Sequence, residues 1–244
     1  MYRKSIIVAL VLIYLVIIAG AVVRMTGSGM GCPDWPKCFG RWVPPTSVAQ
    51  LPDELDEASF NFELAWIEYI NRLVGVVIGG LILATALVAW LDHRQQRSIL
   101  LPSIITLVLV VFQGWFGGQV VAYELDPRFV TIHLFVAITI IGTLIYSTVM
   151  SFVAAGVKLQ TEFMPKRLGL LAYLASAACF VQILLGALVR GNIDLITSAM
   201  PNLERGLLLE QVGWLDEVHR TGGLVVVVVF RVEEVARGHA AGDD

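Results

Sequence analysis

Residues 98–123 read SILLPSIITLVLVVFQGWFGGQVVAY, 26 consecutive positions without an aspartate, glutamate, lysine or arginine. A helix of about 20 apolar residues crosses the hydrocarbon core of a bilayer with its backbone hydrogen bonds satisfied internally. This stretch therefore predicts a transmembrane helix. The whole chain fits a membrane setting, because 57 % of its 244 residues are hydrophobic and only 15 % are charged, against about 25 % charged in soluble domains. The composition excludes a soluble globular enzyme, a disordered chain and a small disulfide scaffold.

Four further uncharged stretches predict transmembrane helices of their own. They are residues 5–23, 73–91, 129–157 and 168–189, with 19, 19, 29 and 22 residues respectively. A sixth candidate, 214–230, is weak, because its uncharged part, 221–230, has only 10 residues. We therefore expect an all-α fold, a polytopic membrane helical bundle with five strong spans and a weaker sixth.

The distribution of basic residues predicts the orientation of these helices. Cytoplasmic loops of membrane proteins carry an excess of lysine and arginine. With a cytoplasmic N-terminus and alternating helices, the cytoplasmic segments hold nine basic and six acidic residues, and the opposite side holds eight basic and 14 acidic residues. We therefore expect both termini in the cytoplasm. The net charge of −3, without a basic patch, argues against nucleic acid as a partner.

The sequence contains an internal repeat. Residues 19–24 (AGAVVR) match residues 185–190 (LGALVR) at an offset of 166, and residues 68–72 (EYINR) match residues 216–220 (DEVHR) at an offset of 148. The repeat argues against cleavage of the first helix as a signal peptide, although Arg3 and Lys4 precede it. It predicts a complete first four-helix repeat at 1–157, a partial, pseudo-symmetric second repeat at 158–230 and a polar tail at 231–244. With two helices where the first repeat has four, the second repeat is expected to be incomplete at its C-terminal side.

Polar residues recur at fixed spacing near the ends of the predicted helices. Glu68, Asn71 and Arg72 lie at positions i, i+3 and i+4, so one face of a helix carries all three. Ionisable residues in membrane segments carry a functional hypothesis by default. The second set, with the same spacing, and a further histidine one turn into the fourth helix are Asp216, His219, Arg220 and His133. We expect these sets to occupy one layer of the bilayer on the side opposite the cytoplasm.

These residue types suit a metal or heme site. A neutral imidazole facing a bundle interior is a common metal or heme ligand, and an arginine beside it suits a carboxylate. The alternative is that the acid–arginine sets are intrahelical ion pairs at a membrane interface and that His133 is packed in the core. The recurrence of the set in both repeats favours the functional interpretation.

Two of the three cysteines lie in the first loop after a helix. Cys32 and Cys38 flank five residues on the expected non-cytoplasmic, oxidising side, which favours a disulfide. A metal site has similar spacing, but no histidine lies nearby. Cys179 lies inside the fifth predicted helix and is expected to be inert packing.

Several motifs together resemble the heme A synthase family. Residues 20–38, GAVVRMTGSGMGCPDWPKC, are similar to the first-loop signature of that family, and Glu68-x-x-Asn71-Arg72 is similar to its Glu-x-x-His-Arg motif. The supporting matches are residues 113–118 (QGWFGG), His133, residues 182–190 (QILLGALVR) and His219-Arg220. The resemblance extends over residues from about 5 to 230.

The resemblance implies an eight-helix protein of the inner membrane, built from two four-helix bundles. Such proteins oxidise a ring methyl of heme O to a formyl group, giving heme A for cytochrome oxidase. They hold the substrate heme in one half and a heme b cofactor, through paired histidines, in the other. The resemblance also implies a heme O synthase and an electron donor as partners. In this chain it assigns the substrate to 1–157 and the cofactor to 158–230.

Position by position, the resemblance assigns a role to each candidate residue. Glu68 is the catalytic acid. His133 is an iron ligand in the first half, and His219 is an iron ligand in the second. Arg72 and Arg220 stand near heme propionates, and Cys32 and Cys38 match the outer-loop cysteine pair.

The sequence departs from the family pattern in two places. Asn71 stands where the family has a histidine, so an iron at His133 would keep one strong protein ligand and an open position, as oxygen activation requires. The seventh and eighth helices, with the expected partner of His219, are not in the sequence. The alternatives are a fragment, a second copy that completes the site in a homo-oligomer, or loss of the second heme. A non-catalytic b-type heme-binding protein and an inactive fragment remain alternative functions, and the acid at Glu68 favours the enzyme.

Overall fold

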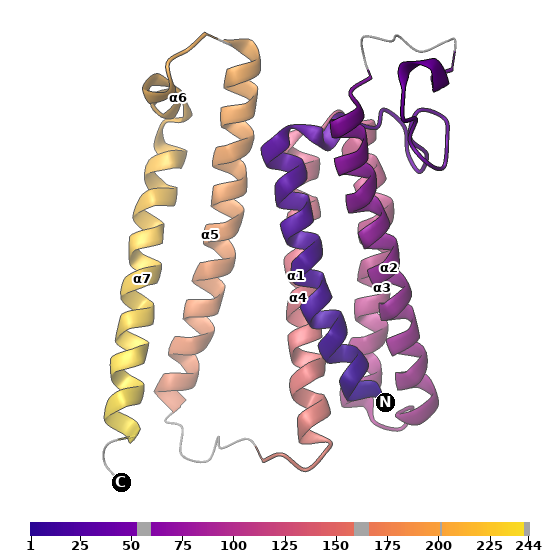
Figure 1. Cartoon of the computed structure of the whole chain (residues 1–244). Coiled ribbons are helices and arrows are strands. Elements are labelled where there is room, and N and C mark those ends of the chain that lie inside the picture. Colours follow the sequence, from indigo (N-terminus) through magenta and orange to yellow (C-terminus); the bar gives the residue numbers. More distant parts are fainter. Residues whose placement is uncertain (53–59, 159–165, 201, 242–244) are drawn as a thin grey trace. The chain divides into compact units, whose positions relative to one another are not determined.

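The structure is a computed structural model that describes residues 1–52, 60–158, 166–200 and 202–241 (Figure 1). Within these ranges the chain is helical, without a β-strand. The helices are α1 (Tyr2–Thr26), α2 (Phe62–Asp92), α3 (Arg97–Ala122), α4 (Pro127–Val153), α5 (Lys166–Ala199), α6 (Arg205–Val212) and α7 (Trp214–Ala241), with short 3-10 turns η1 (Ser28–Met30) and η2 (Val48–Gln50). The predicted all-α class is confirmed.

Five of the described helices, α1 to α5, are long and apolar enough to cross a membrane, which confirms the five strong spans. The fifth continues past its predicted end at Val189 to Ala199. Arg190 and Asp194 form an ion pair of 3.0 Å in this extension, one turn apart, which supports helix beyond the apolar stretch. α7 is long but does not reach the same hydropathy, and its helix continues through 231–241, the segment expected to be a polar tail.

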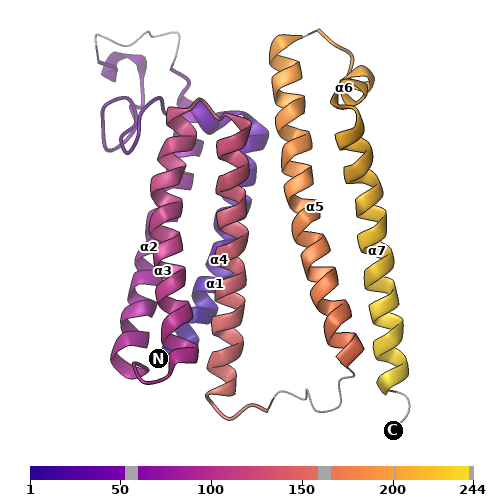
Figure 2. The ribbon, with the colours of Figure 1, turned by 180° about the vertical axis from the view of Figure 1, so that it is seen from behind.

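The chain divides into two compact units, Met1–Val157 and Lys158–Asp244. In the first unit, α1 packs against α2 and α4, and α3 packs against the same two helices, so the four helices form a closed ring of up-and-down neighbours (Figure 2). All four helices contribute to its apolar core, for instance through Ile6, Ile78, Ile99 and Ile140. The ring is the bundle expected from four consecutive apolar helices joined by connections that return the chain.

Capping residues fix where the helices of the first unit begin. Asn61 accepts a hydrogen bond of 3.1 Å from the backbone N–H of Leu64 at the start of α2. Asp126 caps α4 in the same way, with Pro127 at the first helical position. At the end of α1, Gly27 has φ of 70°, a conformation that stops the helix and suits glycine. The first turns of α2 and α4 therefore lie at the end of the bundle where α1 and α3 finish.

The second unit is built on two long helices. α5 and α7 pack against each other and run in opposite directions, with α6 between them in the sequence. Gly213, with φ of 66°, separates α6 from α7. This pair presents His219 on α7 toward α5.

Candidate functional site

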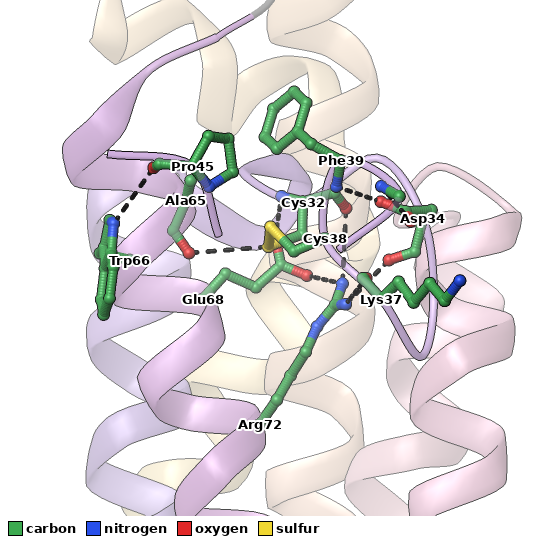
Figure 3. The surroundings of a disulfide bond; sticks show 11 residues. Cys32, Asp34, Lys37, Cys38, Phe39, Pro45, Ala65, Trp66, Glu68 and Arg72 are labelled. Carbon is green, nitrogen blue, oxygen red and sulfur yellow. Dashed lines mark hydrogen bonds and ion pairs between the residues drawn. A yellow bond between two sulfur atoms is a disulfide. The ribbon is translucent and has the colours of Figure 1, made fainter. Parts of the chain in front are cut away.

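The loop after α1 is a compact, cross-linked unit (Figure 3). Cys32 and Cys38 are buried and joined by a disulfide, with 4.8 Å between their Cα atoms. The side chain of Asp34 accepts hydrogen bonds from the backbone N–H groups of Phe39, at 2.6 Å, and Gly40, at 2.9 Å. These bonds hold the loop in one conformation, so the loop can act as a rigid part of a site.

This loop is seated directly on the backbone of α2. A Cβ atom at Gly31 would overlap the backbone of Leu64 and lie 2.8 Å from the backbone nitrogen of Ala65, so only glycine fits. Next to it, Sγ of Cys32 lies 3.6 Å from the carbonyl oxygen of Ala65. The close approach brings the loop amides within reach of the side chains on the next turn of α2.

The acid and the arginine of α2 are both bound to this loop. Glu68 is only 3 % exposed, and its Oε2 accepts a 2.7 Å hydrogen bond from the backbone N–H of Cys32. Its Oε1 is paired with Arg72, four residues later. The guanidinium of Arg72 also donates to the carbonyl oxygens of Asp34 and Lys37, at 2.8 Å each (Figure 3). A buried carboxylate is tolerated when it is paired and hydrogen-bonded in this way.

His133 lies in the second turn of α4, where α3 leaves space for its ring. A Cβ at Gly117 would lie 3.4 Å from Cε1 of the imidazole. Phe116 stacks beside the ring, with 6.4 Å between centroids and 15° between planes. The side-chain Nε2 of Gln113 donates a 3.0 Å hydrogen bond to the carbonyl oxygen of His133. His133 therefore contacts α3 both through its imidazole ring and through its backbone carbonyl group.

Four side-chain polar atoms of the first unit are buried without a hydrogen-bond partner among the described residues. One is Oγ of Ser147, 14 positions after His133 on α4. The other three belong to motifs found in the sequence. They are Oδ1 of Asn71, Oε1 of Gln113 and Nδ1 of His133. Buried polar groups are almost always hydrogen-bonded, since leaving one unbonded costs roughly 1–3 kcal/mol. These three atoms could hydrogen-bond to a bound molecule, and one of them belongs to an imidazole, so they fit a heme or another polar ligand in this bundle.

The next glycine of α3 receives the disulfide loop. A Cβ at Gly118 would lie 2.7 Å from Cδ2 of Trp35, so the indole occupies the space that glycine leaves. The consecutive residues Gly117 and Gly118 thus accommodate His133 and the loop, respectively. This arrangement ties the loop to α3 as well as to α2.

The second unit holds a comparable histidine in a more exposed setting. A Cβ at Gly186 on α5 would lie 2.9 Å from Cε1 of His219. The side-chain nitrogen of Gln182 donates to the carbonyl oxygen of His219 and lies 2.9 Å from Nδ1 of the same residue. Arg220 is paired with Asp216 at 2.9 Å, but its side chain is 68 % exposed, against 15 % for Arg72.

The structure brings some of the expected site residues together and separates others. Glu68 and Arg72 share one cluster with the disulfide, and Asn71 and His133 contribute buried polar atoms to the same unit. The set around His219 belongs to the other unit. In the described part of the chain, no three His, Cys, Asp or Glu side chains are grouped to hold a metal ion, although a heme iron needs only one or two protein ligands.

Two glutamines were not expected to contact the histidines. Gln113 bonds to His133 from 20 positions away, and Gln182 bonds to His219 from 37 positions away. The available signal was the spacing Gln-x-x-x-Gly, which occurs at 113–117 and 182–186. Spacing places glutamine and glycine on one helix face but does not say which helix faces them.

A model of the family described as cytochrome oxidase assembly protein matches residues 3–235. The chain belongs to this cytochrome oxidase assembly family. Among its curated relatives are proteins named heme A synthase. That of Geobacillus kaustophilus is 28 % identical over 87 % of this chain and 64 % of the relative. That of Ehrlichia canis is 27 % identical over 81 % and 62 %, and that of Shewanella oneidensis is 33 % identical over 57 % and 42 %.

Membership in the cytochrome oxidase assembly family confirms the resemblance found in the motifs. The chain covers less than two thirds of the length of these relatives. No solved structure matches the chain. Together with the five apolar helices, the family identifies a multi-pass membrane protein.

Proposed function

We propose that the chain acts in heme A biosynthesis, oxidising a ring methyl of heme O to a formyl group at the bundle of α1–α4. The observation that carries the proposal is the buried Glu68, held at the same end of the bundle as the half-buried His133, whose Nδ1 is buried. The relatives named heme A synthase support it. We place this activity in the cytoplasmic membrane, with the N-terminus in the cytoplasm.

His133 is the residue that would hold the substrate iron. Its half-buried ring packs against Gly117 and Phe116, which fixes the plane of the imidazole. A heme held there supplies an iron centre for oxidation of the methyl group. Asn71, with a buried and unbonded Oδ1, offers a hydrogen-bonding amide in place of a second strong ligand. That substitution suits a site that must admit oxygen.

Glu68 is the residue that would exchange a proton with the reacting group. Both of its oxygens are bound, one to the backbone N–H of Cys32 and one to Arg72. A carboxylate held in a fixed position can act as a general base without first being oriented. Both terminal nitrogens of Arg72 are engaged by Glu68 and by loop carbonyls. We therefore assign Arg72 to positioning Glu68 rather than to a propionate.

The second unit would hold the heme b cofactor through His219. With the amide nitrogen of Gln182 donating to Nδ1, the proton of the neutral ring lies on Nε2. Iron binding at Nε2 requires that proton to move. Arg220 is exposed enough to reach a propionate beside its partner Asp216. We propose that heme O synthase and an electron donor are functional partners.

A non-catalytic heme-binding protein is the second candidate. The observation that favours it is that both oxygens of Glu68 are already bound by the loop and by Arg72. A carboxylate with both oxygens bound can have a purely structural role, in which it holds the loop against α2. Loss of heme A formation in Glu68→Gln with intact heme binding would favour the enzyme, because the amide keeps the shape of the side chain.

Heme extraction tests the proposal. The chain is expressed in cells that make heme O but no heme A, purified from the membrane, and its hemes are separated by chromatography and identified by mass. We expect heme A from the unaltered chain and none from Glu68→Gln or His133→Ala. Heme O or heme b alone would support the binding protein, and a chain without heme would contradict both functions.

A further inference from the structure

The same arrangement of three residues occurs once in each unit. In the first, Gln113 on α3 donates to the backbone carbonyl of His133 on α4, and Gly117, one turn after the glutamine, lies against the imidazole. In the second, Gln182 on α5 donates to the backbone carbonyl of His219 on α7, and Gly186 lies against its ring. Each histidine is therefore packed on a Gln-x-x-x-Gly face of the preceding long helix.

The helix pair α1 and α2 lacks both the glutamine and the histidine. The internal repeat aligns Gln182 with Val16 at an offset of 166 and aligns His219 with Asn71 at an offset of 148. The glycine is kept, as Gly20. Within this chain, the glutamine is present where the following helix has a histidine and absent where that helix has an asparagine. This pattern links the glutamine to the imidazole rather than to helix packing, for which the glycine suffices.

The unbonded atoms indicate what the glutamine does in the first unit. Gln113 is anchored by its amide nitrogen, which leaves Oε1 buried without a described partner, and His133 leaves Nδ1 in the same condition. In the second unit, an amide anchored on the same carbonyl lies 2.9 Å from Nδ1 of His219. There it is the amide nitrogen that reaches Nδ1, whereas in the first unit neither Oε1 of Gln113 nor Nδ1 of His133 has a hydrogen-bond partner among the described residues. A histidine that binds iron through Nε2 carries its proton on Nδ1 and donates it to an acceptor.

We propose that Gln113 is the positioning residue of His133: with a heme in the α1–α4 bundle, its unbonded Oε1 would turn to accept the Nδ1–H of the imidazole and so leave an unprotonated Nε2 toward the iron. This inference rests on the proposed function, because it takes His133 as an iron ligand. It adds a residue that orients the ligand and sets its basicity. Gln113 itself moves no proton, because its oxygen only accepts the hydrogen bond from the Nδ1–H that the imidazole carries.

Hemin titration of the purified full-length chain tests this assignment. All proteins carry His219→Ala, so that only the first unit binds through a histidine. Gln113→Met keeps the length of the side chain and removes the acceptor, and we expect it to weaken hemin binding about 10- to 100-fold. The matched control is Gln96→Met, which removes the exposed glutamine that lies 3.0 Å from Nδ1 of His93 in the α2–α3 loop. It should leave the affinity unchanged.

A vibrational readout separates positioning from packing. In the reduced, five-coordinate complex, resonance Raman measures the iron–histidine stretching frequency, which rises as the ligand imidazole gains anionic character. We expect Gln113→Met to lower this frequency and Gln113→Glu to raise it above that of the unaltered glutamine. Equal frequencies and affinities in all three proteins would overturn the role of Gln113. Hemin binding that is absent, or unchanged by His133→Ala, would instead overturn the iron site of the proposed function and the inference with it.

Discussion

The backbone N–H of Cys32 donates a 2.7 Å hydrogen bond to Oε2 of Glu68, across 36 positions of sequence. This bond joins the disulfide loop to the buried acid of α2. Arg72 strengthens the junction, because it pairs with Glu68 and also donates to three carbonyl oxygens of the loop. The loop is therefore part of the site, and we expect substitutions in the loop to alter the position of the Glu68 carboxylate.

Removal of the disulfide should loosen this junction. Cys38→Ser opens a short cross-linked loop, and we expect it to lower the free energy of unfolding by about 2 kcal/mol, the loop-closure entropy of a ring of this size. Unfolding in detergent, followed by tryptophan fluorescence, measures the loss. The unaltered chain in reductant should show the same loss. Cys179→Ser, at the free cysteine, should show neither the loss nor a response to reductant.

The two acid–arginine pairs should differ in their contribution to stability. Arg72→Met leaves a buried carboxylate without its cation and removes bonds to the loop, and we expect a cost of about 3–5 kcal/mol. Arg220→Met removes an exposed arginine with the same i, i+4 geometry, and we expect less than about 1 kcal/mol. Similar losses in the two variants, measured by the same unfolding assay, would show that the loop contacts of Arg72 contribute little.

Gly118 should not tolerate a side chain, whereas Gly114 on the same helix should. A Cβ at Gly118 would lie 2.7 Å from Trp35, and nothing lies within 4 Å of a Cβ at Gly114. We expect Gly118→Ala to cost about 1–3 kcal/mol through overpacking, and Gly114→Ala to be neutral or to stabilise by up to about 1 kcal/mol. Protease cleavage in the loop gives a second readout, and it should increase only in Gly118→Ala.

Asn71→His should change the spin state of a heme bound at His133. A histidine at this position offers a second strong ligand, so ferric heme is expected to shift from high spin to low spin. Electron paramagnetic resonance and the visible absorption of the hemin complex measure the shift, with Asn71→Gln as a control that keeps the amide. A spin state that stays the same in Asn71→His, with equal activity, would contradict an open position opposite His133.

Much of the architecture could be predicted because the bilayer imposes a simple rule on the sequence. Long uncharged stretches have to be helical, so 98–123 and its four counterparts predict five of the observed helices. The extension of α5 to Ala199 was not predicted, because its residues are polar and their helix depends on local ion pairing rather than on apolar length. α6 was not predicted either, because it is short and lies in the connection between two long helices.

In the candidate site, contacts within one helix were predictable from the sequence and contacts between distant segments were not. The spacing of Glu68 and Arg72 predicts their pairing, since residues one turn apart on a helix are neighbours. Their attachment to the loop was not predictable from spacing. It depends on Gly31 letting the loop approach the backbone of α2, which is a contact between segments far apart in the chain.

The sequence by itself determined the five strong membrane-spanning helices and the residue types available for chemistry, because apolar length and helical periodicity are local properties. The tertiary structure decided which helix faces which. It placed Gln113 against His133 and Cys32 against Glu68, pairs separated by 20 and 36 positions that no local pattern joins. The physical reason is that such contacts depend on how the helices pack and on where glycines permit close approach, and both are properties of the assembled bundle.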